Sequence, residues 1–141
     1  MKKFLLIIAF IAVGFVMQAQ TVAEIEETVA RFNNPSTPCN QGGEAFNDFI
    51  AKFSTDQEFL NSRLKLTEAQ KSEYAELLVP ENFTAKLPFA KDDDMFYQAW
   101  GELQFNSAYL DCGWVDSYCT HTFEFKRIGG KWYLAKVVVD E

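Results

Sequence analysis

His121, the single histidine of the chain, lies two residues after Cys119 in the stretch CTHTF. If this stretch is a strand, the two side chains share a face, because successive side chains of a strand alternate. A thiol beside an imidazole can serve nucleophilic catalysis or hold a metal ion. A zinc site would need one or two more ligands, and the chain has no second histidine to supply one. A disulfide would also remove the Cys119 thiol. We therefore assign no catalytic residue and expect no metal site and no cofactor.

The orientation of His121 depends on the hairpin predicted from FEFKRIGGKWYLAKVV, residues 123–138. The Gly-Gly pair at 129–130 suits a two-residue turn, because glycine tolerates the positive φ angles that such turns require. The register that follows pairs Phe123 with Lys136. Alternation then predicts an inward face with these members: Cys119, His121, Phe123, Phe125, Arg127, Trp132, Leu134, Lys136 and Val138.

A lysine on the inward face is costly unless it is paired or hydrated, and a cavity opening onto that face would remove the cost. We therefore predict a pocket lined by His121, Lys136, Phe123 and Trp132 that holds a small, partly apolar ligand. The nearby lysine would disfavour the charged imidazole, so His121 should be neutral near pH 7. The alternative is that His121 is a hydrogen-bonded core residue and that Lys136 reaches water at a sheet edge.

The first 19 residues have the form of a secretory signal peptide. Two lysines precede an apolar run from Phe4 to Val16, which is shorter than the roughly 20 residues that span a membrane. Cleavage is expected near Ala19, and the alternative is an uncleaved signal anchor. We expect residues 20–141 to form a single domain in the periplasm or outside the cell, with no membrane insertion after cleavage.

The chain is acidic, with a formal net charge of −7. This balance argues against nucleic acid as a partner, because phosphates favour a basic face. Three cysteines are expected to remain after export, namely Cys39, Cys112 and Cys119. An oxidising compartment then predicts one disulfide and one remaining thiol. Cys112 could pair with Cys119 across a hairpin loop, or Cys39 could be the partner of either.

Apolar residues at helical spacing predict helices over 21–32, 43–53 and 54–64. Ser54 with Gln57, and Thr67 with Gln70, look like helix caps. Residues 67–104 are harder to assign, and the signals from 106 onward are those of strands. Helices followed by antiparallel strands indicate an α+β fold, with helices on one face of a sheet. The predicted core stripe of the second helix is Phe46, Phe49, Ile50 and Phe53.

The stretch FNDFIAKFSTDQEFLNSRL and the later FEFKRIGGKWYLAKV resemble a secreted Bacteroidetes family labelled only as a domain of unknown function. That family is similar to the nuclear transport factor two-like superfamily, which includes ketosteroid isomerase and the polyketide cyclases. The resemblance implies a cone, in which a strongly bent antiparallel sheet wraps around helices and a pocket lies at the open end. It implies no reaction, because this scaffold carries enzymes, ligand binders and assembly modules.

Two classes of function follow. The first is an exported binding module whose pocket on the concave sheet face holds a small organic ligand. The second is an isomerase, cyclase or hydratase that works without a cofactor on the same scaffold. Binding ranks first because the spacing of carboxylates and tyrosines defines no acid–base set. A homodimer through the outer face of the sheet is compatible with both classes.

Overall fold

The computed structural model describes residues 26–84, 96–114 and 119–139, with the side chains of residues 96, 97, 114, 119 and 120 left out. The predicted signal peptide and its cleavage site lie outside these residues. Within the described ranges, no helix combines the length and the apolar character needed to cross a membrane.

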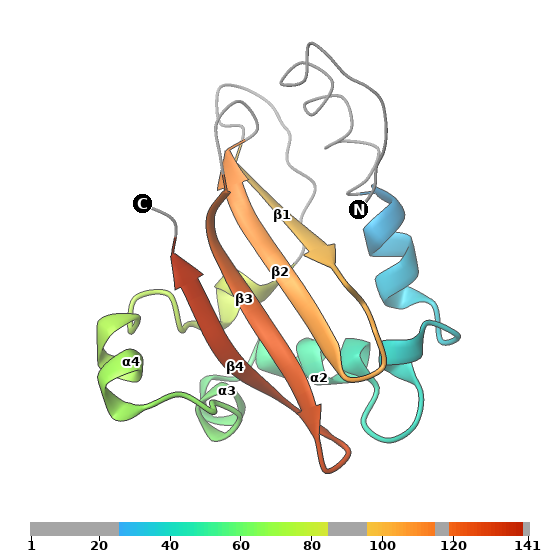
Figure 1. The fold of residues 1–141 in the computed structure, drawn as a ribbon, viewed down its shortest axis with the longest axis horizontal. Coiled ribbons are helices and arrows are strands. Elements are labelled where there is room, and N and C mark those ends of the chain that lie inside the picture. The colour runs from blue at the N-terminus through green and yellow to red at the C-terminus, as the bar shows by residue number, and fades with distance from the viewer. Residues whose placement is uncertain (1–25, 85–95, 115–118, 140–141) are drawn as a thin grey trace.

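Helical segments come first and strands follow (Figure 1). A helix over 26–33 precedes the sheet together with these segments: η1 (Pro38–Asn40), α2 (Phe46–Phe53), α3 (Gln57–Ser62), α4 (Glu68–Glu73) and η2 (Pro80–Phe83). The strands are β1 (Phe96–Gly101), β2 (Ser107–Trp114), β3 (Cys119–Ile128) and β4 (Lys131–Val139). They form one antiparallel sheet in the order β1-β2-β3-β4, and α2 lies behind it in the view of Figure 1. The predicted α+β class is confirmed.

Helix α2 forms where the stripe of apolar residues predicts it. Its members Phe46, Phe49, Ile50 and Phe53 are all buried. The helix begins later than expected, at Phe46, because Gly42 and Gly43 have positive φ angles of 74° and 126° that an α-helix does not accommodate.

The next two helices begin at side-chain caps. Asp56, and not Ser54, is the N-cap of α3, since its carboxylate accepts hydrogen bonds from the backbone N–H groups of Glu58 and Phe59 at 3.0 and 3.2 Å. Thr67 and Gln70 form the predicted capping box of α4. Each cap satisfies amide groups that have no partner within the helix.

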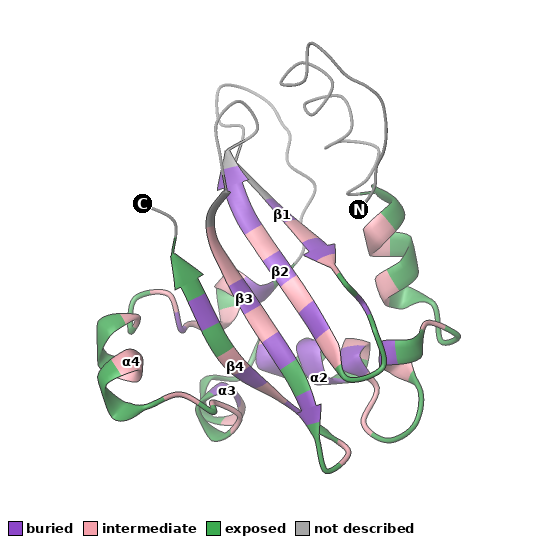
Figure 2. Cartoon of the chain, viewed as in Figure 1, coloured by how far each residue is buried: buried purple, intermediate pink, exposed green. Residues whose placement is uncertain are grey.

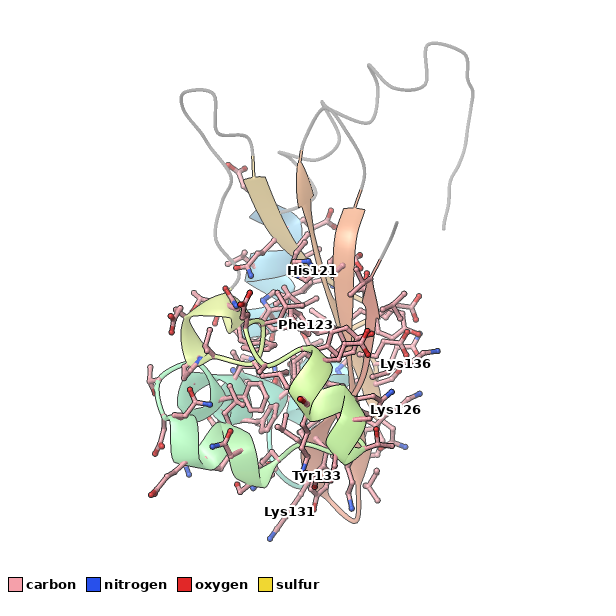
Figure 3. All side chains as sticks on the ribbon, turned by 90° about the vertical axis from the view of Figure 1, so that its left-hand side faces the viewer. His121, Phe123, Lys126, Lys131, Tyr133 and Lys136 are labelled. Atoms are coloured by element: carbon pink, nitrogen blue, oxygen red, sulfur yellow. The ribbon has the colours of Figure 1, made fainter. Side chains whose placement is uncertain are left out.

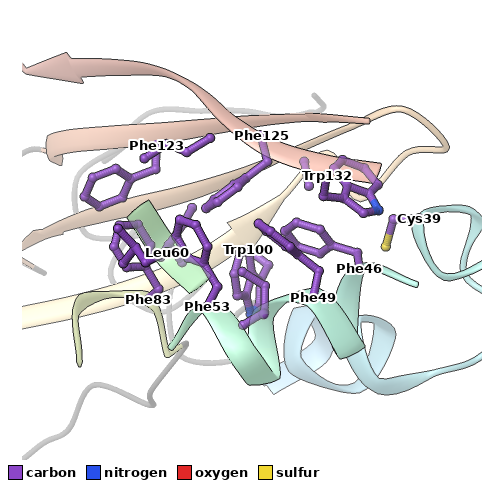
Figure 4. Packing of buried hydrophobic residues seen from close by; sticks show 14 of the residues in the cluster. Cys39, Phe46, Phe49, Phe53, Leu60, Phe83, Trp100, Phe123, Phe125 and Trp132 are labelled. Atoms are coloured by element: carbon purple, nitrogen blue, oxygen red, sulfur yellow. The ribbon is translucent and has the colours of Figure 1, made fainter. Parts of the chain in front are cut away.

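Aromatic rings fill the space between α2 and the sheet (Figure 4). Phe125 lies at the centre, within 5.4 to 6.1 Å of the ring centroids of Phe46, Phe49, Phe53 and Phe83. All five rings are fully buried. The alternation of buried and less buried residues along the strands in Figure 2 shows that only one face of the sheet carries this core.

The β3–β4 hairpin turns at Gly129 and Gly130, whose φ angles are +60° and +81°, as predicted. The predicted register holds as far as the pair Phe125 and Leu134. Beyond it the register shifts by one residue, so that Glu124, and not Phe123, lies opposite Lys136. Ala135 is the extra residue of this β-bulge.

The bulge changes which face the end of β4 presents to the core. Val137 is buried and Lys136 is exposed, the reverse of the prediction from unbroken alternation. A bulge disrupts the ladder locally and leaves one residue unpaired, which forfeits about 1 kcal/mol of hydrogen bonding. An inward, unpaired ammonium group would cost several kcal/mol. The bulge therefore costs less free energy than an inward, unpaired Lys136 would.

Two of the three cysteines are buried in the thiol form, Cys39 beside α2 and Cys112 on β2. The predicted disulfide does not join them. The segment between Trp114 and Cys119 does connect adjacent antiparallel strands, but Cys119 lies opposite Gly113 in the ladder, and Cys112 lies opposite His121. The side chain of Cys119 lies outside the described residues.

Candidate functional site

The structure separates the four side chains that were predicted to line a common pocket. His121 and Phe123 point to the helix side of the sheet, whereas Lys136 points away from it (Figure 3). Phe123 and Trp132 have no exposed surface and belong to the aromatic core. The prediction that His121 and Lys136 share a face is wrong, because the bulge at Ala135 reverses the facing of Lys136. Packed rings occupy the predicted pocket.

His121 lies near the beginning of β3, on the inner face of the sheet. It is partly buried, and its ring meets the ring of Phe123 edge-on, with 5.2 Å between centroids. Burial lowers the pKa of His121 below its usual 6.5, which agrees in direction with the predicted neutral imidazole. The cause is desolvation and not the lysine. Ligand binding by His121 stays a prediction.

Register places three chemically active side chains in one row across the inner face. Gln98 of β1 lies opposite Cys112 of β2, and Cys112 lies opposite His121 of β3. The Gln98 amide nitrogen donates to the backbone oxygen of Asn82 at 2.6 Å and to the Cys112 sulfur at 3.7 Å. The Gln98 amide oxygen is buried and accepts no hydrogen bond. The row therefore combines a thiol, an imidazole and an unsatisfied acceptor.

The sequence held a partial signal for this row. Cys112 and His121 both fall in stretches that read as strands, but the pairing of β2 with β3 could not be inferred. Gln98 falls in MFYQAWGELQF, whose spacing suits a helix as well as a strand. The sequence places Cys119 on the same strand face as His121, whereas the cross-strand neighbour of His121 is Cys112.

A second group of polar residues ties the chain together and has a structural role. Arg63 forms a bidentate ion pair with Glu44, with N–O distances of 2.7 and 3.1 Å. Glu44 also accepts from the backbone N–H of Trp132 at 2.9 Å, and its backbone oxygen accepts from the Trp132 indole at 3.0 Å. Burial raises the pKa of Glu44, but hydrogen bonds from Arg63 and Trp132 outweigh it and the net pKa is lowered.

Arg127 completes this structural group without a carboxylate. Its guanidinium donates to the backbone oxygens of Pro38, Gly42, Glu44 and Phe105 at distances of 2.7 to 3.2 Å. The side chain is almost fully buried. A buried cation is tolerated only when its donors are satisfied. Arg127 therefore holds the loop before α2 against the end of the sheet.

A surface groove of about 400 Å³ lies between α3 and α4. Its lining residues are Gln57, Asn61, Leu64, Lys71, Ala75 and Leu78. The Gln57 amide nitrogen donates to the Asn61 side-chain oxygen at 3.0 Å and to the backbone oxygen of Leu78 at 3.2 Å. Lys71 brings a positive charge, with Glu68 at 3.4 Å as its neighbour along the helix.

The groove is joined to the sheet through its floor. Leu64 bridges to Leu134 of β4, and the backbone of Arg63 and Lys65 exchanges hydrogen bonds of 2.8 Å with Leu134. The groove is thus an apolar floor with amide groups and one cation on its walls, anchored to the edge strand. Its volume falls within the range of small-molecule sites, although such sites are commonly more apolar and more enclosed. No local pattern in the sequence predicts this groove, because α3 and α4 are short and the groove depends on how they pack together.

Together, the helices and the single antiparallel sheet define a cystatin-like α+β fold. Among solved structures, the chain is similar to a cystatin-like protein from Bacteroides caccae, with 19% sequence identity and a TM-score of 0.57. The match covers 70% of this chain and 78% of that protein. No family model and no curated protein matches the chain. The likeness shows the fold alone, and the resemblance to a particular family of unknown function stays a prediction.

Proposed function

We propose that this chain is an exported binding module that holds a small ligand in the groove between α3 and α4. The supporting observation is the groove itself, a hollow of about 400 Å³ that joins an apolar floor to the cation of Lys71. A ligand with an apolar body and a carboxylate matches both features, because the body covers Leu64 and Leu78 while the carboxylate meets the ammonium group. Export is proposed from the basic and apolar start of the sequence.

The amide groups add orientation to this proposed site. Gln57 uses its nitrogen for Asn61 and Leu78, so its position is held by the fold and not by a ligand. A preorganised wall lowers the entropy that binding would otherwise cost. Lys71 is only partly exposed, at 35% of its side chain, whereas its neighbour Glu68 is 92% exposed. An incoming carboxylate can therefore compete for the lysine against a weak surface ion pair.

The test uses hexanoate, benzoate and phenylacetate as probes, with amide NMR spectra of the chain. Binding should shift resonances of Gln57, Asn61, Lys71 and Leu78. Lys71→Gln should weaken binding about tenfold, the loss of one charge-assisted contact worth about 1.4 kcal/mol, and Ala75→Trp should block the groove. Lys131→Gln, which removes an exposed lysine that does not line the groove, is the matched control. Absence of any shift at millimolar probe would refute a carboxylate ligand.

A second candidate function is thiol-dependent catalysis at the inner-face row. The observation that favours it is the direct cross-strand pairing of Cys112 with the neutral imidazole of His121. The imidazole could accept the thiol proton, and the Gln98 amide could stabilise developing negative charge. Cys112 has no exposed surface, which ranks this candidate below binding. Alkylation of Cys112 by iodoacetamide at a rate that falls in His121→Gln would favour it.

A further inference from the structure

The outer face of the sheet has no described helix over it (Figure 1). Strand alternation presents Tyr109, Asp111, Glu124, Lys126, Ile128, Lys136 and Val138 on this side. Ile128 and Val138 are 51% and 40% exposed, which is high for large aliphatic side chains. A mixed apolar and charged sheet face of this kind is suited to contact with another protein surface.

The charges on this face are separated by sign. Asp111 of β2 and Glu124 of β3 form an acidic half together with Glu102, which follows β1 and acts electrostatically on Asp111. Burial raises the pKa of Asp111, and the charges of Glu102 and Glu124 add to this effect, against a lowering by the hydrogen bond from Thr122. The same three carboxylates act on Tyr109 between them, again after burial as the larger cause, and raise its pKa.

Lys126 of β3 and Lys131 and Lys136 of β4 form the basic half, since Lys131 lies opposite the outward-facing Ile128. The side chains of Lys126 and Lys136 point away from the helices (Figure 3), and all three lysines are exposed. The boundary between the halves runs between Glu124 and its register partner Lys136, and between Glu124 and Lys126 along β3. Each half thus occupies one side of a diagonal line across the sheet.

These charges are not neutralised by ion pairs within the chain as far as the structure describes it. The described residues form two ion pairs, Arg63–Glu44 and Lys71–Glu68, and neither lies on the outer face. Asp111 accepts a hydrogen bond from the Thr122 hydroxyl at 2.9 Å, which satisfies one oxygen but supplies no positive charge. Within the described ranges, the face therefore offers anions and cations that form no ion pair.

We propose that the outer face binds the same face of a second copy of this chain, with the acidic half of each copy against the basic half of the other. A two-fold axis lying in the interface along the boundary exchanges the two halves, as an isologous contact requires. A purely basic or purely acidic partner would match only one half and be repelled by the other. The exposed Ile128 and Val138 supply apolar area to the same contact.

This interface is independent of the groove between α3 and α4, whose lining residues are not on the outer face. It is also built from strands alone, so that assembly leaves the proposed ligand site open. The two proposals can therefore fail separately. An outer-face dimer predicts nothing about carboxylate binding, and a ligand bound in the groove predicts nothing about mass in solution.

The experiment is sedimentation equilibrium on the wild type and on two charge-reversed variants. The wild type should be a dimer in the micromolar range. Lys126→Glu/Lys136→Glu reverses two of the three lysines of the basic half, and Glu102→Lys/Glu124→Lys reverses two of the three carboxylates of the acidic half. The face of each variant then carries mainly one sign of charge, so each variant alone should be a monomer. An equimolar mixture should form a heterodimer, because a mainly acidic face then meets a mainly basic one. Such a rescue would not be expected if the reversals merely damaged the fold.

Two controls complete the design. Lys52→Glu/Lys71→Glu imposes the same change in net charge on the helical side, and it should remain dimeric. Thermal melts establish that each reversed variant is folded. A monomeric wild type at millimolar concentration, dimers of either reversed variant alone, or a mixture that stays monomeric would each overturn the proposal. Heterodimer formation that weakens with added salt supports it further.

Discussion

Glu124 lies directly opposite Lys136 in the β3–β4 ladder, and both side chains stand on the face of the sheet that the helices leave uncovered. This pairing is the visible result of the bulge at Ala135. One residue later, Val137 enters the core beside Phe123. The bulge therefore sorts an adjacent lysine and valine to water and to core, and this sorting can be tested by substitution.

Asparagine at positions 136 and 137 should have unequal effects. Val137→Asn buries an amide in an apolar site and loses aliphatic burial, so it should reduce the free energy of unfolding by about 3 kcal/mol. Lys136→Asn changes an exposed position and should stay within about 0.5 kcal/mol. Urea unfolding of both variants measures the difference. Unbroken alternation would reverse the order of the two effects.

Phe125→Ala should strongly destabilise the fold, because four other buried phenylalanine rings surround this one. We expect a loss of about 3–5 kcal/mol, typical of a fully buried phenylalanine. Ile128→Ala removes a half-exposed side chain of the same strand and should cost less than about 1 kcal/mol. Equal losses for the two variants in a thermal or urea melt would contradict the assignment of the faces.

Glu44→Gln should make the chain less stable at neutral pH and leave it unchanged in acid. The pKa of Glu44 is lowered in the folded chain from 4.5, so its contribution is present above that value and is lost as the pH falls through the folded pKa. Urea midpoints of wild type and variant should converge once the pH falls below the lowered pKa of Glu44. Glu73→Gln, at an exposed position of α4, is the control. A difference that persists at pH 2 would exclude the ionic origin.

The imidazole of His121 should titrate below pH 6.5. Burial lowers its pKa in the folded chain, so the stability it supports is complete above 6.5 and is lost as the pH falls through the folded value. The chain has one histidine, so one proton NMR signal reports the titration without ambiguity. A pKa at or above 6.5 would show that the ring is hydrated or beside an anion. His121→Gln should remove this part of the acid sensitivity.

Thiol titration of the unfolded, unreduced chain should report three groups. Cys39 and Cys112 are thiols in the structure, and we expect Cys119 to be a thiol as well. In the folded chain Cys39 should react slowly, because burial raises its pKa to about 11, against a smaller lowering by the charge of Arg127. A count of one reactive thiol would instead indicate the single disulfide that export predicts.

The helices and the hairpin turn were predictable because their signals are local. The stripe from Phe46 to Phe53 repeats with the period of a helix, and the glycines at 129 and 130 allow one type of turn. The capping box of Thr67 and Gln70 is also a local pattern. The cap of α3 was misplaced by two residues because Ser54 and Asp56 both suit that position by type.

The candidate sites were less predictable because they depend on distant pairings. The signal for the bulge was present, since unbroken alternation put Lys136 into the core while Val137 faced water. That conflict was interpreted as a pocket, although a shifted register resolves it as well. The row of Gln98, Cys112 and His121 required the pairing of three strands, which no local pattern determines.

The hydrogen bonds of Arg127 to the loop before α2 also affect the order in which the chain folds. Its hydrogen bonds to Pro38, Gly42 and Glu44 join positions 83 to 89 residues apart. During synthesis, the loop has no such partner until Arg127 has been made. Contacts this distant in sequence are slow to form, because the intervening chain must first be closed into a loop. The loop before α2 therefore reaches its final position only when the β3–β4 hairpin forms, so strands that are synthesised later stabilise a segment that was synthesised earlier.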